Sequence, residues 1–247
     1  MAPRRLPLPS EPSVAGMLLL SGLGGLVVAQ PPPAAAVAAL GVLMLHMFSF
    51  DPAFAAIRAR RWSQFVSLTA ANAAPYLVSA AVGAMPLWVL LVAGGVLAGH
   101  SLLFARRGPR DPVVYIVGAA VPVLPALVLP ALVGYVTRWQ LIFWLLLTGH
   151  AVATAAYVET RLPWRRLNPL VPAAVWAPFL VIGAAAEPAT IVALVEPTVK
   201  VARNVFDKDR VIEPRPEEVK RLGWRELYRL LVFTVLLIGS LLYASRA

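Results

Sequence analysis

The stretch that decides the fold is residues 86–110, PLWVLLVAGGVLAGHSLLFARRGPR. Residues 86–105 contain no Asp, Glu, Lys or Arg, and Arg106, Arg107 and Arg110 follow at once. About 20 apolar residues cross the hydrocarbon core of a bilayer. Short loops rich in Lys and Arg stay on the cytoplasmic side during insertion. The stretch therefore predicts a transmembrane helix over 86–105 whose carboxyl end faces the cytoplasm.

The same pattern recurs along the chain. Of 22 Lys and Arg, 20 lie in the N-terminus or in the loops that follow every second apolar run. This alternation predicts nine membrane crossings with the N-terminus and most basic loops in the cytoplasm. The basic clusters are Arg4 and Arg5; Arg58, Arg60 and Arg61; Arg106, Arg107 and Arg110; Arg161, Arg165 and Arg166; and nine residues from Lys200 to Arg229.

The predicted fold is an all-α polytopic transmembrane bundle whose helices form hairpin pairs. Residues 1–199 hold helices one to eight, 200–225 form a charged cytoplasmic segment, and 226–247 hold the final transmembrane helix, preceded by a helix that starts at Pro216. Because Glu196 and Pro197 interrupt the eighth helix, eight spans with a re-entrant segment are the alternative. The predicted spans are 14–30, 34–50, 65–84, 86–105, 113–136, 139–158, 169–186, 188–206 and 226–243.

The composition places the chain among integral proteins of the cell membrane. Hydrophobic residues make up 60% of it and charged residues 14%, values outside those of soluble domains. The net charge of +10 is spread over loops that flank the membrane, which argues against nucleic-acid binding. The chain has no cysteine, which excludes disulfides, thiolate metal ligands and a cysteine nucleophile.

Four ionisable residues lie on the returning helices of the hairpins: His46, His100, His150 and Glu196. Such side chains usually face a bundle interior or a wet cavity, so they are candidate ligand-binding residues. The alternative is that each histidine bonds a neighbouring helix. Their distances from the basic ends differ by roughly 12 Å at 1.5 Å per residue, too far for ligands that converge on one metal ion. No metal site is predicted, and the cofactor is left open.

Carboxylates accompany the basic clusters. Asp51 precedes Arg58, Glu159 precedes Arg161, and Asp111 follows Arg106. Arginines beside a carboxylate at a cavity mouth suit a phosphate or diphosphate headgroup. The alternative is that they are topology signals held in intramolecular ion pairs.

Three stretches carry a family resemblance: AYVETRL at 156–162, RRGPR at 106–110, and the tail 197–239 with KRLGWREL at 220–227. Together they resemble the YwiC-like family of bacterial and archaeal membrane proteins. The resemblance implies an integral membrane protein without an established biochemical role.

The predicted topology is also similar to that of UbiA-type intramembrane prenyltransferases, with nine spans, an inner N-terminus and a cavity open to the cytoplasm. Those enzymes hold magnesium and diphosphate with Asp-rich motifs after the second and sixth helices. Asp51 and Glu159 occupy these places here. Without paired carboxylates, magnesium–diphosphate chemistry is not expected.

The leading hypothesis is a membrane protein that binds a lipid or other apolar ligand in a cytoplasm-facing cavity, prenyltransferase-like but without the Asp-rich metal motifs. Its polar head would meet the arginine loops near the inner ends of the second and sixth helices. Two alternatives stay open. One is a haem-binding or structural anchor subunit of a redox complex. His46 and His150 would then be the axial ligands of the haem, and the partners would be other membrane subunits. The other is a small-solute transporter. Whether the protein is an enzyme is left open.

Overall fold

The computed structural model describes residues 12–108, 110–165, 167–207, 211–213 and 215–246, with the side chains of Pro12 and Arg58 excepted. Every regular element in these ranges is helical, which confirms the all-α prediction. The basic cluster at Arg4 and Arg5 lies outside the described residues. The elements are α1 (Pro12–Ala29), α2 (Pro33–Arg58), α3 (Trp62–Ala81), α4 (Leu87–Arg107), α5 (Pro112–Gly118), η1 (Val121–Val123), α6 (Pro125–Leu132), α7 (Arg138–Arg161), α8 (Val171–Ala186), η2 (Pro188–Thr190), α9 (Ile191–Phe206) and α10 (Pro216–Ala244).

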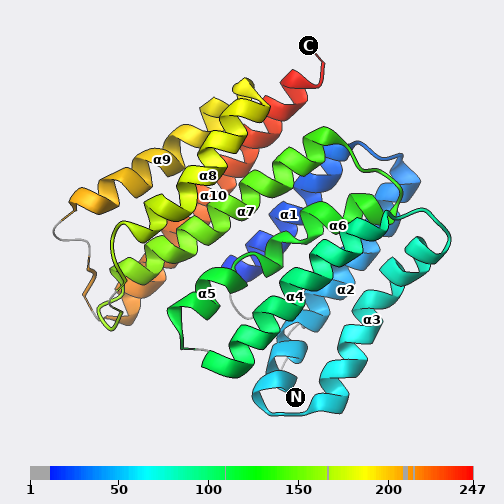
Figure 1. Ribbon diagram of the computed structural model, residues 1–247, viewed down its shortest axis with the longest axis horizontal. Helices are drawn as coiled ribbons and strands as arrows, with labels where there is room; N and C mark the ends of the chain where they lie inside the picture. Colours follow the sequence, from blue (N-terminus) through cyan, green and yellow to red (C-terminus); the bar gives the residue numbers. More distant parts are fainter. Residues whose placement is uncertain (1–11, 109, 166, 208–210, 214, 247) are drawn as a thin grey trace, which may run out of the picture.

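The connections between helices gather along two opposite edges of the molecule (Figure 1). The α2–α3, α4–α5, α7–α8 and α9–α10 connections share one edge, which we call the basic edge because the arginine clusters lie there. Contacts among these loops include two hydrogen bonds: the Arg165 guanidinium donates to the carbonyl oxygen of Arg110, and the Ile212 amide donates to that of Arg161 at 3.0 Å. The hairpin order predicted from the sequence therefore brings the basic loops together.

Five helical segments among the described residues are long and apolar enough to cross a membrane. Two shorter apolar helices, Ser13–Ala29 and Val171–Ala186, accompany them. Helices α3 and α9 are not among the five. The number of crossings and their direction stay predictions. The five segments are Pro33–Ile57, Leu87–Arg107, Pro112–Leu132, Arg138–Arg161 and Pro216–Ala244.

Two expected helix ends are wrong. Asp51 was expected in a loop, but α2 continues through Pro52 to Arg58. Pro197 was expected to interrupt the eighth helix, but α9 continues through it. The connection before this helix lies at Glu187, between the predicted spans 169–186 and 188–206, and the Glu187 side chain accepts from the amide of Ala189 at the start of η2. Membrane helices tolerate proline because neighbouring groups satisfy the freed backbone.

The charged segment predicted at 200–225 is largely helical. Its first residues complete α9, and α10 begins at Pro216, as expected, and passes Gly223 without a break. Proline suits the first helical position, and Glu217 and Glu218 favour the positive end of the helix dipole. The fifth predicted span is divided into α5, η1 and α6.

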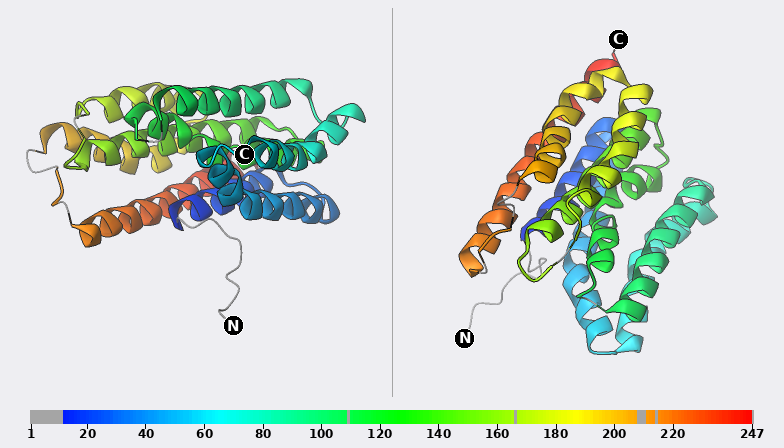
Figure 2. Two further views of the ribbon diagram at one scale, coloured as in Figure 1. Left: turned by 90° about the horizontal axis from the view of Figure 1, so that it is seen from below. Right: turned by 60° about the vertical axis from the view of Figure 1, so that its left-hand side comes forward.

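The core lies around α1, α6 and α7, and α1 contacts α2, α6, α7 and α10 (Figures 1 and 2). A Cβ on Gly25 of α1 would lie 2.8 Å from the Ala126 Cα atom, so only glycine lets these two backbones approach. Within the most apolar 18-residue stretch of each helix, 56% of the residues are buried in Arg138–Arg161 but 17% are buried in Leu87–Arg107. The share is 28% in Pro216–Ala244 and 22% in Pro33–Ile57. Because α7 to α10 pack on one another around the buried α7, we call them the densely packed half. We call α2 to α4 the loosely packed half, because α3 and α4 do not pack closely on each other.

Candidate functional site

The structure divides the nine candidate residues into two groups. His46, Asp51, Arg58, His100 and Arg106 belong to α2 and α4 in the loosely packed half. Arg58 ends α2, and its side chain lies outside the described residues. His150, Glu159, Arg161 and Glu196 belong to α7 and α9 in the densely packed half. Among the candidate side chains that are described, His46 and His100 line the cavity described next, and no member of the second group does.

A cavity of about 690 Å³ lies between α2, α3 and α4, with η1 and α6 at its base. Sites for small molecules are typically of 300–1,000 Å³, mostly apolar, with a few polar groups. No Asp, Glu, Lys or Arg is among the described residues that line this cavity. Helices α3 and α4, both described throughout, pack on α6 but not closely on each other. The polar lining residues are His46, Ser49, Thr69, Asn72, Tyr76, His100 and Ser101.

His46 belongs to a hydrogen-bonded cluster in the cavity wall. Its Nδ1 atom lies 2.5 Å from Oδ1 of Asn72, and its Nε2 atom contacts the Tyr76 hydroxyl. Because an amide oxygen only accepts, Nδ1 carries the hydrogen and Nε2 accepts from Tyr76. The Asn72 Nδ2 atom donates to the Leu68 carbonyl at 2.8 Å, and Ser49 also contacts Asn72 Oδ1, at 3.0 Å. Both imidazole nitrogens are therefore satisfied by the protein.

His100 is different. It lines the same cavity and is 8% exposed, yet neither ring nitrogen has a hydrogen-bond partner among the described residues, and Nδ1 is enclosed. The rings of Phe54 and Phe104 lie 6.2 Å from its centroid. A Cβ on Gly118 would lie 2.7 Å from its Cε1 atom. The imidazole is thus held between α5 and two phenyl rings without a polar partner.

The cavity lies toward the basic edge. Its lining on α2 runs from His46 to Ile57, and its lining on α4 runs from Leu90 to Phe104, close to the last residue of each helix. Residues three or four apart share a helix face, so Arg107 lies on the cavity-facing side one turn beyond Phe104. The α2–α3 connection adds two exposed arginines at this end. We call Arg60, Arg61 and Arg107 the mouth arginines.

His150 lies far from this setting, inside the densely packed half. Its ring stacks on Phe233 of α10, with centroids 4.3 Å apart, and meets the edge of Trp176 of α8. It is 1% exposed, and neither nitrogen has a partner among the described residues. The haem alternative needs His46 and His150 on facing helices, but they belong to separate clusters.

An ion network stands beside His150 and joins α7, α9 and α10; Lys200 and Glu226 are buried in it, whereas Arg229 and Glu196 are partly exposed. Lys200 donates to Thr154 at 2.8 Å and to Glu226 at 3.0 Å, and its side chain is 3% exposed. Arg229 contacts Glu226 at 2.8 Å and the candidate Glu196 at 3.2 Å. Arg225 also approaches Glu226, at 3.7 Å, so three basic side chains share two carboxylates in this network.

The two remaining candidates are paired near the basic edge. Arg161 contacts Asp207 at 2.7 Å and lies over the Tyr157 ring, and Glu159 contacts Arg165 at 2.9 Å. Seven basic residues from Arg161 to Arg229 have a carboxylate partner. In this half the arrangement matches the ion-pair alternative.

No protein-family model, curated protein or solved structure matches this chain. The YwiC-like and UbiA-type resemblances therefore stay predictions. Within the part of the chain that is described, no three His, Asp or Glu lie close enough to hold a metal ion.

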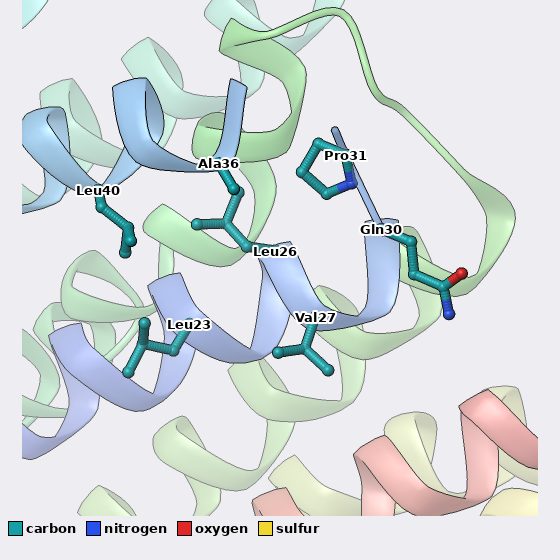
Figure 3. Close-up of a pocket in the computed structure, with 7 residues that line it drawn as sticks. All are labelled: Leu23, Leu26, Val27, Gln30, Pro31, Ala36 and Leu40. Carbon is teal, nitrogen blue, oxygen red and sulfur yellow. The ribbon is translucent and has the colours of Figure 1, made fainter. Parts of the chain in front are cut away.

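A second hollow, of about 260 Å³, lies beside the α1–α2 connection (Figure 3). Its lining is apolar apart from Gln30, whose amide points away from the other labelled side chains. No candidate residue reaches it, so the cavity of α2 to α4 is the candidate site.

Several residues of the His46 cluster and of the ion network were not predicted as site residues from the sequence. Asn72 and Tyr76 are polar residues in an apolar helix, a signal that was visible but not specific. Lys200 and Glu226 fall at the ends of two predicted spans, where charged residues are common. Their contact depends on α9 and α10 lying side by side, which local patterns do not encode.

Proposed function

We propose that this is a multi-pass membrane protein that binds a lipid or other apolar ligand in the cavity between α2, α3 and α4, with its basic edge in the cytoplasm. The observation that carries the proposal is a mostly apolar cavity of about 690 Å³ whose lining on α2 and α4 reaches the ends of these helices where the arginines lie. An apolar chain fits the lining, and a polar head fits the arginine end. Because the lining residues include no carboxylate, we propose binding and assign no reaction.

A photoreactive hexadecanol with a diazirine near its chain end tests the site. In proteoliposomes we expect crosslinks to cavity residues such as Phe50 and Thr69. Gly94 lines the cavity with open space at its Cβ position, so Gly94→Phe should fill the cavity and remove these crosslinks. Gly95 has equal space but does not line the cavity, so Gly95→Phe is the matched control. Labelling spread evenly over outward-facing residues, and unchanged by Gly94→Phe, contradicts the proposal.

The orientation has a separate test. The chain has no cysteine, so single cysteines at Arg107, Arg165 and the exposed Ala84 can be labelled with a membrane-impermeant maleimide in intact cells and in inverted vesicles. We expect positions 107 and 165 to react in inverted vesicles and position 84 in intact cells, since short basic loops stay inside. Labelling of positions 107 and 165 on opposite faces rules out the predicted topology.

A further inference from the structure

Two sets of arginines share the basic edge, but their charges are balanced differently. In the densely packed half, carboxylates accompany most basic residues, as described above. Around the cavity mouth, Arg60, Arg61 and Arg106 form no ion pair with the described residues, and Arg107 approaches Asp111 at 3.8 Å. The topology rule alone explains basic residues in both places. Arg203 and Lys220 of the other half also form no ion pair with the described residues, so the contrast is one of degree. The arginines beside the cavity have one long pair, whereas seven basic residues of the other half are paired.

His100 adds a second observation inside the cavity. A buried polar group without a partner calls for a physical explanation. His150 also lacks partners, but aromatic rings enclose it, whereas His100 lines the cavity, where a bound molecule can supply the missing partner. Because Nδ1 is enclosed and has no acceptor, the hydrogen of the neutral ring belongs on Nε2, where it can be donated. His100 lies seven residues before Arg107, roughly 10 Å along the helix.

These observations specify the ligand more closely, and the inference rests on the proposed function. We propose that the cavity binds a single-chain lipid with a phosphate head and one ester carbonyl, as in a monoacylglycerol phosphate. The mouth arginines contact the phosphate, and His100 donates a hydrogen bond to the ester carbonyl.

The chain then extends past Phe54 toward the base of the cavity. The cavity volume is that of a single small-molecule site, which suits one chain better than two. The His46 cluster closes the lining at this depth, and its hydrogen bonds are already satisfied within the protein. The lipid therefore needs no polar group at the end of its chain.

Competition against the photoreactive hexadecanol distinguishes the parts of this ligand. The competitors are 1-palmitoylglycerol 3-phosphate, hexadecyl phosphate, which lacks the ester, and hexadecanol, which lacks the charge. We expect the first to compete best and hexadecanol least. Hydrogen bonds to charged groups contribute about 1.5–3 kcal/mol, which corresponds to roughly ten- to hundredfold between hexadecyl phosphate and hexadecanol.

Two variants assign the contacts. Replacing Arg60, Arg61 and Arg107 with Gln should remove the advantage of both phosphates over hexadecanol. The His100→Leu variant should remove the advantage of 1-palmitoylglycerol 3-phosphate over hexadecyl phosphate while leaving hexadecyl phosphate unchanged. A variant that merely disturbed the fold would weaken all three competitors, and its crosslinking by the photoreactive hexadecanol would also fall.

The control is the Arg215→Gln, Arg221→Gln double variant, which removes two exposed basic residues of the other half. It should leave every competitor unchanged. Equal competition by all three lipids overturns the inference while the proposed function stands. The inference is also overturned if the control variant loses the advantage of the phosphate lipids over hexadecanol to the same extent. The basic residues would then attract the phosphate lipids in general, without a site at the cavity mouth. Absence of cavity crosslinks in the unmodified protein defeats the proposed function itself.

Discussion

The dipeptide Gly-His occurs at 99–100 in α4 and at 149–150 in α7, and its two copies have opposite surroundings. A Cβ on Gly149 would lie 2.2 Å from the Phe179 ring, and His150 is enclosed by Phe233 and Trp176. Nothing lies within 4 Å of a Cβ on Gly99, and His100 lines a cavity. The same local sequence therefore serves packing in one half of the molecule and borders a binding space in the other.

The largest expected effect tests whether the densely packed half depends on its ion network. In Glu226→Gln, the buried Lys200 loses its carboxylate, and breaking a buried pair costs about 3–5 kcal/mol of the free energy of unfolding. Unfolding by sodium dodecyl sulfate in mixed micelles measures the change. The control is Glu213→Gln, whose pair with Arg215 is exposed and is expected to contribute at most about 1 kcal/mol. Similar losses in both variants contradict the contrast between the halves.

The next prediction compares the two glycines directly. Gly149→Ala forces α7 and α8 apart, and overpacking of this kind costs about 1–3 kcal/mol. Gly99→Ala meets no neighbour, so the free energy of unfolding should be unchanged or rise by up to about 1 kcal/mol. Thermal unfolding in detergent reports both. If Gly99→Ala is the more destabilising, then α4 packs against a surface that we have not recognised.

The smallest effect concerns His46. Tyr76→Phe removes the hydroxyl that donates to Nε2 and leaves this nitrogen of His46 without a partner. Hydrogen bonds between helices in membranes contribute about 0.6 kcal/mol on average and at most about 1.7 kcal/mol. We expect a loss in that range, measured by the same melting experiment, against Tyr243→Phe, whose side chain is exposed. A loss well above this range implies that Tyr76 supports more than the histidine.

Much of the fold follows from local patterns. Apolar runs locate the helices, and Asp111 caps α5 as its Asp-Pro pair indicates, since its Oδ1 atom accepts from the Val113 amide at 2.8 Å. The Asp51-Pro52 pair also indicates the start of a helix, but it lies inside α2. The difference is that proline within a membrane helix is tolerated when packing and neighbouring residues satisfy the backbone, which the dipeptide does not reveal.

The candidate site was predicted in part. His46 and His100 do line a cavity toward the basic edge, but His150, Glu159 and Glu196 lie elsewhere. The haem alternative paired His46 with His150, but their helices α2 and α7 do not pack closely on each other. Hairpin order gives each histidine a place along its own helix and not the helix that faces it. Position along a span is a local property, whereas facing is a property of the assembled bundle.

The sequence by itself determined that the chain is helical, that its hairpins alternate in direction, and that most of its described arginines lie along one edge, because apolar length and charge act locally on each segment. The tertiary structure alone decided which Gly-His is buried and which arginines find carboxylates. Those outcomes depend on Phe179, Phe233 and Asp207, which reach α7 from other helices and from the loop after α9 only when the bundle has packed.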